Sequence, residues 1–306
     1  MNKGIIGLFT AVFLWGIAIA PIRWALESMG PLTLLFLRLL ISSLFLLPYV
    51  YWRNKTLWSS FVFHWKHIIV LSITGVAGYY LFYTVGVDLT SAVHASILSA
   101  AIPMFTLILA FFLLKEKILI PQWCGLLMGT TGILLISVKA EMGSSSSLLG
   151  DLFVLASCLM WAFYVIHLKK IGKIVQLPNE VFTALTIAAG TILSAPLAFI
   201  EIAYTGMPVW TFSSFINLMY VALLSTVIAY LIWNWAMGMV TAASAGIWIT
   251  FMPLIEVLTS VVLLNEVLTW RVLIGGLFVL FGLFWAEYSI FINPLKRSRQ
   301  NRNFSQ

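Results

Sequence analysis

This chain has little charge, few acidic residues and almost no cysteine. Only 9% of its 306 residues are charged and 62% are hydrophobic, with a mean hydropathy of +1.05. Because that composition offers too little polar surface to cover a soluble globule, it predicts a protein of the lipid bilayer. The two cysteines, Cys124 and Cys158, lie in apolar runs and support neither a disulfide framework nor a cysteine metal site.

Several sequence motifs of known chemistry are also missing. The chain has no H-E-x-x-H, no G-x-S-x-G, no paired intramembrane aspartates and no G-x-x-x-x-G-K-[ST] loop. These absences argue against an intramembrane enzyme and against ATP-driven transport. We expect no catalytic residues, no cofactor and no metal, since His64 and His67 lie close together without a third ligand nearby.

The net charge of +7 does not indicate nucleic-acid binding. The basic residues are scattered among the ends of hydrophobic runs and form no single patch. Membrane lipids, through their anionic headgroups, are the partners that this distribution favours. The loops are short, so no obligate protein partner is evident.

What the chain does have is a tandem duplication. Segments 91–116 and 241–266 are two versions of one sequence, and the register continues without gaps to residues 132 and 282. Chance apolar matching would rarely align the residue types that recur: Pro103 with Pro253, Glu116 with Glu266, Gly125 with Gly275 and Gly132 with Gly282. A duplication inside so hydrophobic a chain is typical of membrane transporters.

Ten apolar runs have the roughly 20 residues needed to cross a bilayer. They predict helices at residues 4–26, 32–51, 67–87, 91–114, 118–138, 149–168, 180–203, 213–237, 241–264 and 269–291. The predicted fold is therefore all-α and integral to the membrane, with ten transmembrane helices as two five-helix repeats.

The basic residues predict the orientation of these helices. With the N-terminus in the cytoplasm, 13 of the 17 basic residues lie inside, and the exceptions are Arg23, Arg38, Lys139 and Arg271. We expect a multi-pass protein of the cell membrane with both termini cytoplasmic. Because five helices is an odd number, the second repeat is expected to be inverted. The predicted parts are a first repeat at 1–138, an external linker at 139–148, a second repeat at 149–291 and a basic cytoplasmic tail at 292–306.

The order of motifs resembles the EamA branch of the drug/metabolite transporter superfamily over nearly the whole chain. The matching positions are Trp15-Gly16, Pro31 with Arg38, Pro103 to Glu116, and Pro253 to Glu266. Two departures are Lys115 and Asn265, where a Leu-Gly-Glu ending is common in the family, and a third is Ala162 after Trp161. The resemblance implies a substrate cavity at the centre of the bundle, used for export of amino acids or related metabolites.

Glu256 is the acidic residue nearest the middle of a predicted span. A carboxylate there costs about 3 kcal/mol on insertion scales, so it is expected to face a wet cavity or a partner. At helical spacing it shares a stripe with four residues: Trp248, Met252, Thr259 and Ser260. We interpret it as a site for a substrate ammonium group or a coupling proton, and the alternative is a structural hydrogen bond to a neighbouring helix.

Two further polar residues are candidates for substrate binding. Arg38 lies inside the second span, where it is either an anchor for a substrate carboxylate or a cap on carbonyl groups and headgroups. His94 begins the fourth span, where it is either a proton relay or a histidine satisfied at the interface. Arg23 is expected to contact headgroups.

Aromatic residues complete the predicted binding wall. Those that lie well inside the spans or share a helix face with them are Tyr79, Tyr83, Trp161, Tyr164, Tyr230 with Asn234, and Trp248. Such residues favour flat or amphipathic substrates, and cation–π contact favours an ammonium group. Most membrane aromatics only pack or form interface belts, which is the competing interpretation.

Pro103 and Pro253 are predicted hinges in equivalent helices, because each removes a backbone hydrogen bond. Static kinking for packing is the alternative. Glu116 and Glu266 each precede another span, and we expect each carboxylate to complement the N-terminus of that next helix.

The function that these features favour is secondary transport by alternating access. The substrate is expected to be a small molecule, either an amino acid or an amphipathic metabolite, that is exported with or without proton coupling. A membrane receptor or scaffold is the main alternative, since it needs no chemistry, and an intramembrane enzyme is a weaker one.

Overall fold

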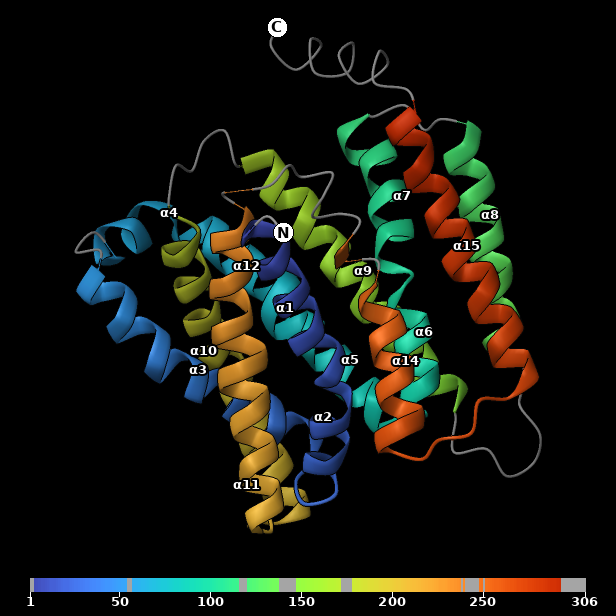
Figure 1. Ribbon diagram of the computed structural model, residues 1–306. Helices are drawn as coiled ribbons and strands as arrows, with labels where there is room; N and C mark the ends of the chain where they lie inside the picture. Colours follow the sequence, from blue (N-terminus) through green and yellow to red (C-terminus); the bar gives the residue numbers. More distant parts are fainter. Residues whose placement is uncertain are drawn as a thin grey trace, which may run out of the picture.

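The computed structural model of the protein shows a bundle of helices (Figure 1). The structure describes residues 3–53, 57–115, 120–137, 147–171, 178–237, 239, 248–249 and 251–292. The first repeat contains α1 (Lys3–Ile17), α2 (Ile19–Leu26), α3 (Pro31–Arg53), α4 (Leu57–Leu71), η1 (Ser72–Gly78), α5 (Tyr79–Leu89), α6 (Ala92–Ser99), α7 (Ile102–Leu114) and α8 (Ile120–Ser137). The second contains α9 (Leu148–Ile171), α10 (Asn179–Thr205), α11 (Phe212–Met219), η2 (Tyr220–Ile228), α12 (Ala229–Met237), α14 (Met252–Leu263) and α15 (Trp270–Ile292). No strand occurs among the described residues, in line with the predicted all-α class.

Seven helical stretches of the described chain are long and apolar enough to cross a membrane. They are Lys3–Leu26, Pro31–Arg53, His64–Leu89, Ala92–Leu114, Leu148–Leu168, Glu180–Thr205 and Phe212–Trp233. Three shorter apolar helices, at Ile120–Ile136, Met252–Leu263 and Trp270–Gly282, fall where the fifth, ninth and tenth spans are predicted. The multi-pass character is clear, whereas the count of ten and the inverted topology stay predictions. Most of the predicted linker and nearly all of the predicted tail lie outside the described residues.

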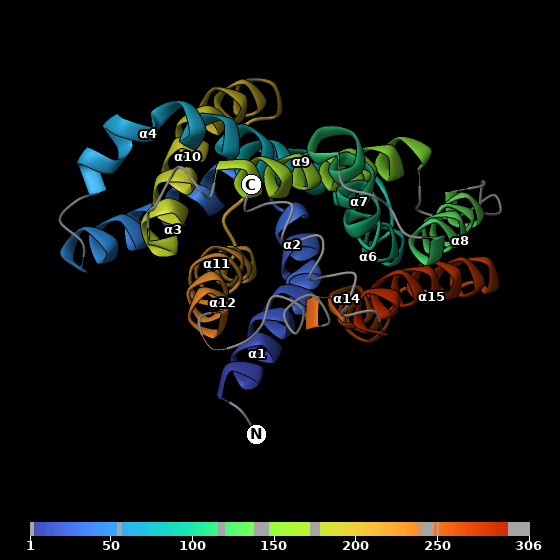
Figure 2. The same ribbon diagram turned by 90° about the horizontal axis from the view of Figure 1, so that it is seen from above.

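Helices of one repeat pack against helices of the other. The second, fourth and fifth helical units of the first repeat contact their counterparts, as α3 with α10, α6 with α14 and α8 with α15. In addition α1 packs against α12, and α5 packs against α9. This reciprocal pattern is the one that a two-fold axis between the repeats produces. Figure 2 shows α8 and α15 at one edge of the molecule, with α3, α4 and α10 at the other.

The fifth and tenth helical units approach closely because glycines face each other at their contact. A Cβ atom added to Gly132 would lie 2.4 Å from the carbonyl oxygen of Gly275, and one added to Gly282 would lie 2.6 Å from that of Gly125. Both contacts are shorter than real Cβ atoms show. The glycines that recur between the repeats therefore pack α8 against α15.

Several membrane-length stretches are interrupted near their middle. The first breaks at Ala18, and the fourth breaks at Ala100 and Ala101, between α6 and α7. Two others, His64–Leu89 and Phe212–Trp233, each contain a π-helical segment, η1 and η2, which end 150 residues apart at Gly78 and Ile228. The sequence analysis did not predict these segments. Because π-helical turns are rare and often occur at functional sites, their recurrence in both repeats directs attention to the centre of the bundle.

The prediction for Glu266 is wrong about which helix the carboxylate serves. Its two carboxylate oxygens accept hydrogen bonds from the backbone N–H groups of Ala92 and Val93, each at 2.8 Å, at the start of α6 in the other repeat. The antiparallel packing of α14 on α6 brings the end of one helix to the beginning of the other. Glu116 lies outside the described residues.

Two other charged residues also serve helix ends. Glu201 accepts hydrogen bonds from the backbone N–H groups of Leu32 at 3.1 Å and Thr33 at 2.7 Å, at the start of α3. Arg23 donates to the carbonyl oxygens of Val87 and Asp88, at the end of α5. Arg23, for which a headgroup contact is expected, thus contacts backbone carbonyl groups within the bundle, because α2 lies beside α5.

The two departures from the Leu-Gly-Glu ending have a clear conformation. Lys115 and Asn265 both adopt left-handed backbone angles, with φ of 55° and 54°. A glycine adopts this conformation without steric cost, whereas an L-amino acid with a Cβ does not. Both repeats therefore build the same turn, at a small conformational cost.

Candidate functional site

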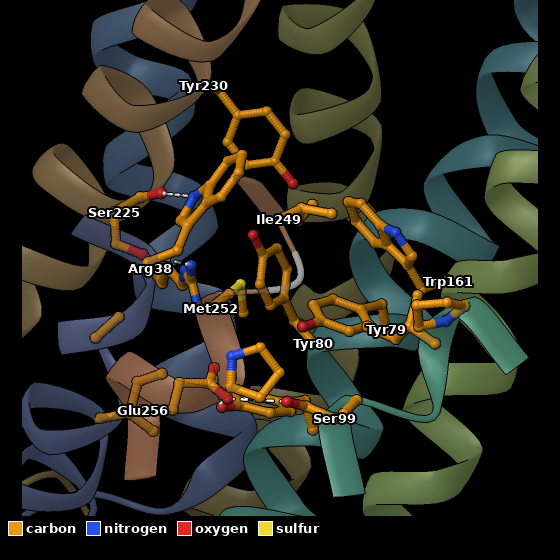
Figure 3. A pocket seen from close by; sticks show the side chains of 18 residues that line it. Arg38, Tyr79, Tyr80, Ser99, Trp161, Ser225, Tyr230, Ile249, Met252 and Glu256 are labelled. Atoms are coloured by element: carbon orange, nitrogen blue, oxygen red, sulfur yellow. Dashed lines mark hydrogen bonds between the residues drawn. The ribbon is translucent and has the colours of Figure 1, made fainter. Parts of the chain in front are cut away.

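A cavity of about 110 Å³ lies between the two repeats (Figure 3). Its size suits a small solute or several water molecules, since a cavity of roughly 10–15 Å³ by this measure already holds one water. The first repeat contributes Trp15, Ala18, Ile22, Arg38, Tyr79, Tyr80, Tyr83, Ser99, Ala100, Ile102 and Pro103. The second contributes Trp161, Ser225, Tyr230, Ile249, Met252, Pro253 and Glu256. The wall is mostly apolar and aromatic, with a few polar groups that converge on the space.

Glu256 lies on the first turns of α14 and is only 1% exposed. Its carboxyl group accepts a hydrogen bond from Ser99 Oγ at 2.8 Å and a longer one from Tyr83 Oη at 3.4 Å. Both donors belong to the first repeat, so this group connects the two halves of the molecule. Both interpretations offered for Glu256 therefore have a physical basis: it lines the cavity, and it hydrogen-bonds to neighbouring helices.

Arg38 lines the same cavity and is 4% exposed. Its Nε donates to Thr226 Oγ1 at 2.7 Å, a longer contact of 3.4 Å joins Nη2 to Ser225 Oγ, and its guanidinium carbon lies 3.9 Å from the centre of the Tyr80 ring. These contacts replace the carbonyl caps and headgroups considered from the sequence. Among the described residues, neither Arg38 nor Glu256 has an ion-pair partner.

The π-helical segment η2 builds the surroundings of Arg38. Thr226 Oγ1, which accepts from Arg38, itself donates to the carbonyl oxygen of Val221 at 2.8 Å, five residues earlier. The indole Nε1 of Trp15 donates to the carbonyl oxygen of Ser225 at 2.8 Å. One side chain from each repeat thus satisfies a backbone carbonyl of the widened turns, and this fixes the position of the hydroxyls that hold the guanidinium.

The Trp15-Gly16 motif positions α1 against α14. A Cβ atom on Gly16 would lie 2.5 Å from Ile255 Cγ2, so only glycine permits this approach. The neighbouring Trp15 lies beside Tyr230 of α12, with ring centres 5.3 Å apart. The motif therefore shapes one wall of the cavity.

Four of the predicted aromatic residues line the cavity, namely Tyr79, Tyr83, Trp161 and Tyr230. Tyr79 contacts both Tyr83 and Trp161, with ring centres 5.7 Å and 4.9 Å away. Tyr164 lines a smaller neighbouring pocket of about 10 Å³, which borders Tyr80, Trp161 and Tyr230 from the other side. That space suits about one water molecule.

Two predicted binding residues, Trp248 and His94, lie away from the lining of the cavity, and a third is not described in enough detail to be placed. Trp248 packs against Phe9 and Phe251 and is absent from the lining of the cavity. Asn234 belongs to α12, but its side chain is outside the described part of the chain. His94 is buried away from the lining, with Nδ1 3.4 Å from Oδ2 of Asp151.

The hinge candidates both border the cavity at interruptions of their helices. Pro103 lies in the first turn of α7, directly after the break at Ala100 and Ala101, and Pro253 lies in the first turn of α14. Pro103 has no N–H to donate to the carbonyl oxygen of Ser99, and no backbone donor replaces it among the described residues. The helix is therefore interrupted at this point, between α6 and α7.

His67 has a partner that the sequence did not indicate. Its Nδ1 lies 3.4 Å from Nε2 of His167 on α9, so the two repeats also meet there. The described residues contain no cluster of three or more metal-ligating side chains. His64 and His67 are accordingly not grouped with a third ligand in this part of the chain.

The cavity also contains residues that sequence reasoning missed, chiefly Tyr80, Ser99, Ser225 and Trp15. One signal could have found two of them. The offset of 150 residues pairs Tyr80 with Tyr230 and Ser99 with Ile249, and all four line the cavity. Ser225 gave no such signal, because its position depends on the π-helical turns of η2.

Comparison with known proteins agrees with this architecture. A solved crystal structure is similar with a TM-score of 0.63 and 20% sequence identity, and the match covers 92% of this chain and 96% of the other. The uncharacterized transporter YoaV of Bacillus subtilis is 25% identical over 292 residues, with 94% of this chain and 98% of that protein covered. An uncharacterized transporter of Archaeoglobus fulgidus is 26% identical over 279 residues, covering 90% of this chain and 94% of that protein.

The repeats themselves identify the family. The EamA-like transporter family matches twice, at residues 2–138 and 148–287, which are close to the two repeats expected from the sequence. These matches and the names of the relatives indicate a transporter rather than an enzyme. The chain therefore belongs to the EamA-like transporter family of multi-pass membrane proteins.

Proposed function

We propose that this membrane transporter exports small zwitterionic solutes, such as amino acids or related amphipathic metabolites, by alternating access. The observation that carries the proposal is the pair of buried groups in one cavity, Arg38 and Glu256, neither of which has an ion-pair partner among the described residues. A buried charge without a partner is costly, so a ligand of opposite charge stabilises it. A zwitterion offers a carboxylate to Arg38 and an ammonium group to Glu256.

The aromatic walls fit the rest of such a solute. The faces of Tyr79, Tyr80 and Trp161 provide apolar area and can attract an ammonium group by cation–π contact. The volume of about 110 Å³ favours a compact molecule over a bulky one. Small size, two opposite charges and an apolar body are the properties of an amino acid.

Alternating access is supported by the position of the cavity between the repeats. Rocking of one repeat against the other exposes such a site to each side of the membrane in turn. The breaks beside Pro103 and Pro253 place two interrupted helices at the cavity wall, where each is suited to act as a hinge. We place the protein in the cell membrane with both termini in the cytoplasm, as the basic residues predict.

Proton coupling through Glu256 is the form of energy coupling that we propose. Substrate ammonium and a proton compete for the same carboxylate, so release of one allows binding of the other. Ser99 and Tyr83 donate hydrogen bonds to this carboxyl group, so it keeps polar partners between these two states.

The experiment is a flux assay with the purified full-length protein in vesicles. A panel of amino acids and amphipathic amines is tested with and without a pH gradient. We expect saturable flux of at least one zwitterion. The flux should be faster when the pH gradient drives protons across the membrane in the direction opposite to the zwitterion. Specific binding without flux would instead favour a receptor, and flux that ignores the gradient would favour a uniporter.

A further inference from the structure

Three neighbouring tyrosines of α5 face the cavity, and two of them are engaged in clear contacts. The hydroxyl of Tyr83 donates to Glu256, and the ring of Tyr80 lies against the guanidinium of Arg38. The hydroxyl of Tyr79 has no hydrogen-bond partner in the described part of the chain. Figure 3 shows the Tyr79 ring directed from its helix toward the middle of the pocket.

The Tyr79 side chain has little freedom to find another partner. It is 8% exposed, and its ring is enclosed by three aromatic neighbours: Tyr80 at 5.0 Å, Tyr83 at 5.7 Å and Trp161 at 4.9 Å between ring centres. Buried tyrosine hydroxyls nearly always form a hydrogen bond, because the loss of one inside a protein is costly. Its missing partner is therefore expected among the molecules that occupy the cavity.

The charged ends of a zwitterion do not supply that partner. Arg38 is the cation that suits a carboxylate, and Glu256 is the group that suits an ammonium. Tyr79 lines the cavity together with Tyr80 and Trp161, and its ring contacts both of them. We expect the apolar body of the solute to contact this part of the wall. A polar group on that body, a hydroxyl or an amide, is what the Tyr79 hydroxyl can bind.

We propose that Tyr79 determines specificity, by hydrogen-bonding a third polar group of the solute beside its ammonium and carboxylate. The inference rests on the proposed function and narrows it to zwitterions that carry a hydroxyl or an amide on the side chain. A site that hydrogen-bonds a hydroxyl discriminates against the isosteric analogue that lacks it, because the group of the protein is then left without a partner.

The test compares threonine with valine, and serine with alanine, in vesicles that contain wild-type protein or Tyr79→Phe. Wild type is expected to transport the hydroxylated member of each pair more efficiently. Tyr79→Phe removes only the hydroxyl, so it should reduce the ratio of kcat/KM within a pair by about tenfold. Transport of valine should stay the same or improve, and the ring contacts that support the fold remain.

Two control variants separate this role from general damage. Tyr83→Phe removes a donor to Glu256, so it should lower both members of a pair by the same factor and keep their ratio. Tyr204→Phe lies at a residue that is 88% exposed and should change neither. The melting temperature of each variant shows whether the fold is intact.

The outcomes distinguish this inference from the function on which it rests. Flux of any zwitterion through wild type supports the proposed function, whatever Tyr79→Phe does. An unchanged ratio in Tyr79→Phe overturns the role of Tyr79 alone, and it would mean that water satisfies the hydroxyl. No flux of any zwitterion would overturn the proposed function and this inference together.

Discussion

The fourth and ninth helical units are two copies of one sequence that have acquired different tasks. Both have a proline at an interruption beside the cavity, and both end in a left-handed residue, Lys115 or Asn265. They differ where Thr106 aligns with Glu256. Thr106 donates to the carbonyl oxygen of Ile102 in its own helix, whereas Glu256 accepts hydrogen bonds from two helices of the other repeat.

This difference shows how a duplicated scaffold gains a specific site. The matched residues determine backbone shape, and a backbone shape is useful in both copies. A buried carboxylate is costly, so a second one in the same cavity would repel the first and remain without a partner. Symmetry therefore suits the hinges and turns, and asymmetry suits the group that binds a charge.

The largest effect on transport is expected from removing the charge of Glu256, the residue that differs between the two copies. Glu256→Gln keeps the shape of the side chain but loses its charge, and we expect transport to fall roughly 100-fold or more, the cost of truncating a buried charge contact. The pH dependence of the remaining flux should disappear. Thr106→Val, at the matched position, is the control and should transport normally. Equal activity and unchanged pH dependence in Glu256→Gln would reject its proposed role.

Replacing the prolines at the two helix interruptions should have the next largest effect on transport. Pro103→Ala and Pro253→Ala restore a backbone N–H, and if the breaks are hinges we expect roughly tenfold slower transport with kcat and KM changing together. Thermal stability should stay equal or rise. Pro253→Ala should be the more severe, since Glu256 follows it within one turn. Normal rates in both variants would show that the kinks only serve packing.

A substitution of Glu266 tests whether the second repeat stabilises the first by capping the start of α6. Glu266→Ala removes the acceptor for two N–H groups of α6, and we expect a loss of about 1 kcal/mol in stability, as for other helix caps. Glu201→Ala is the counterpart at α3 and should cost a similar amount. Unfolding in detergent, followed by circular dichroism, measures both. A variant that loses transport without losing stability would assign Glu266 a role in the transport cycle.

The smallest effect is expected at the two left-handed residues. Lys115→Gly should stabilise the protein by about 1 kcal/mol, because glycine adopts this backbone conformation without steric cost. Asn265→Gly should gain less, since asparagine tolerates the left-handed region better than lysine does. Transport should not change in either variant. The same unfolding assay compares them, and a larger gain at Asn265 would contradict this account.

The part of the site that the sequence revealed has a common basis. Glu256 and Arg38 stood out because charged groups are rare within an apolar span, and four aromatic residues stood out because their polar tips need partners there; all six line the cavity. Trp248 looked equally suitable but packs elsewhere, because the spacing that placed it beside Glu256 assumed a continuous helix. His94 was likewise selected by its chemistry alone, and its partner Asp151 lies 57 residues away in the chain.

Composition and the 150-residue repeat by themselves determined the class and the duplication of this protein, and the order of its motifs indicated the resemblance to its family. These properties depend on which residues are present and how far apart they lie. Only the tertiary structure decided that Glu266 caps α6, that η2 holds Arg38, and that the Tyr79 hydroxyl has no partner among the described residues. Each of those depends on contacts between helices that are distant in sequence. Hydrophobic periodicity describes only the face that one helix presents, so it cannot specify which residue of another helix meets that face.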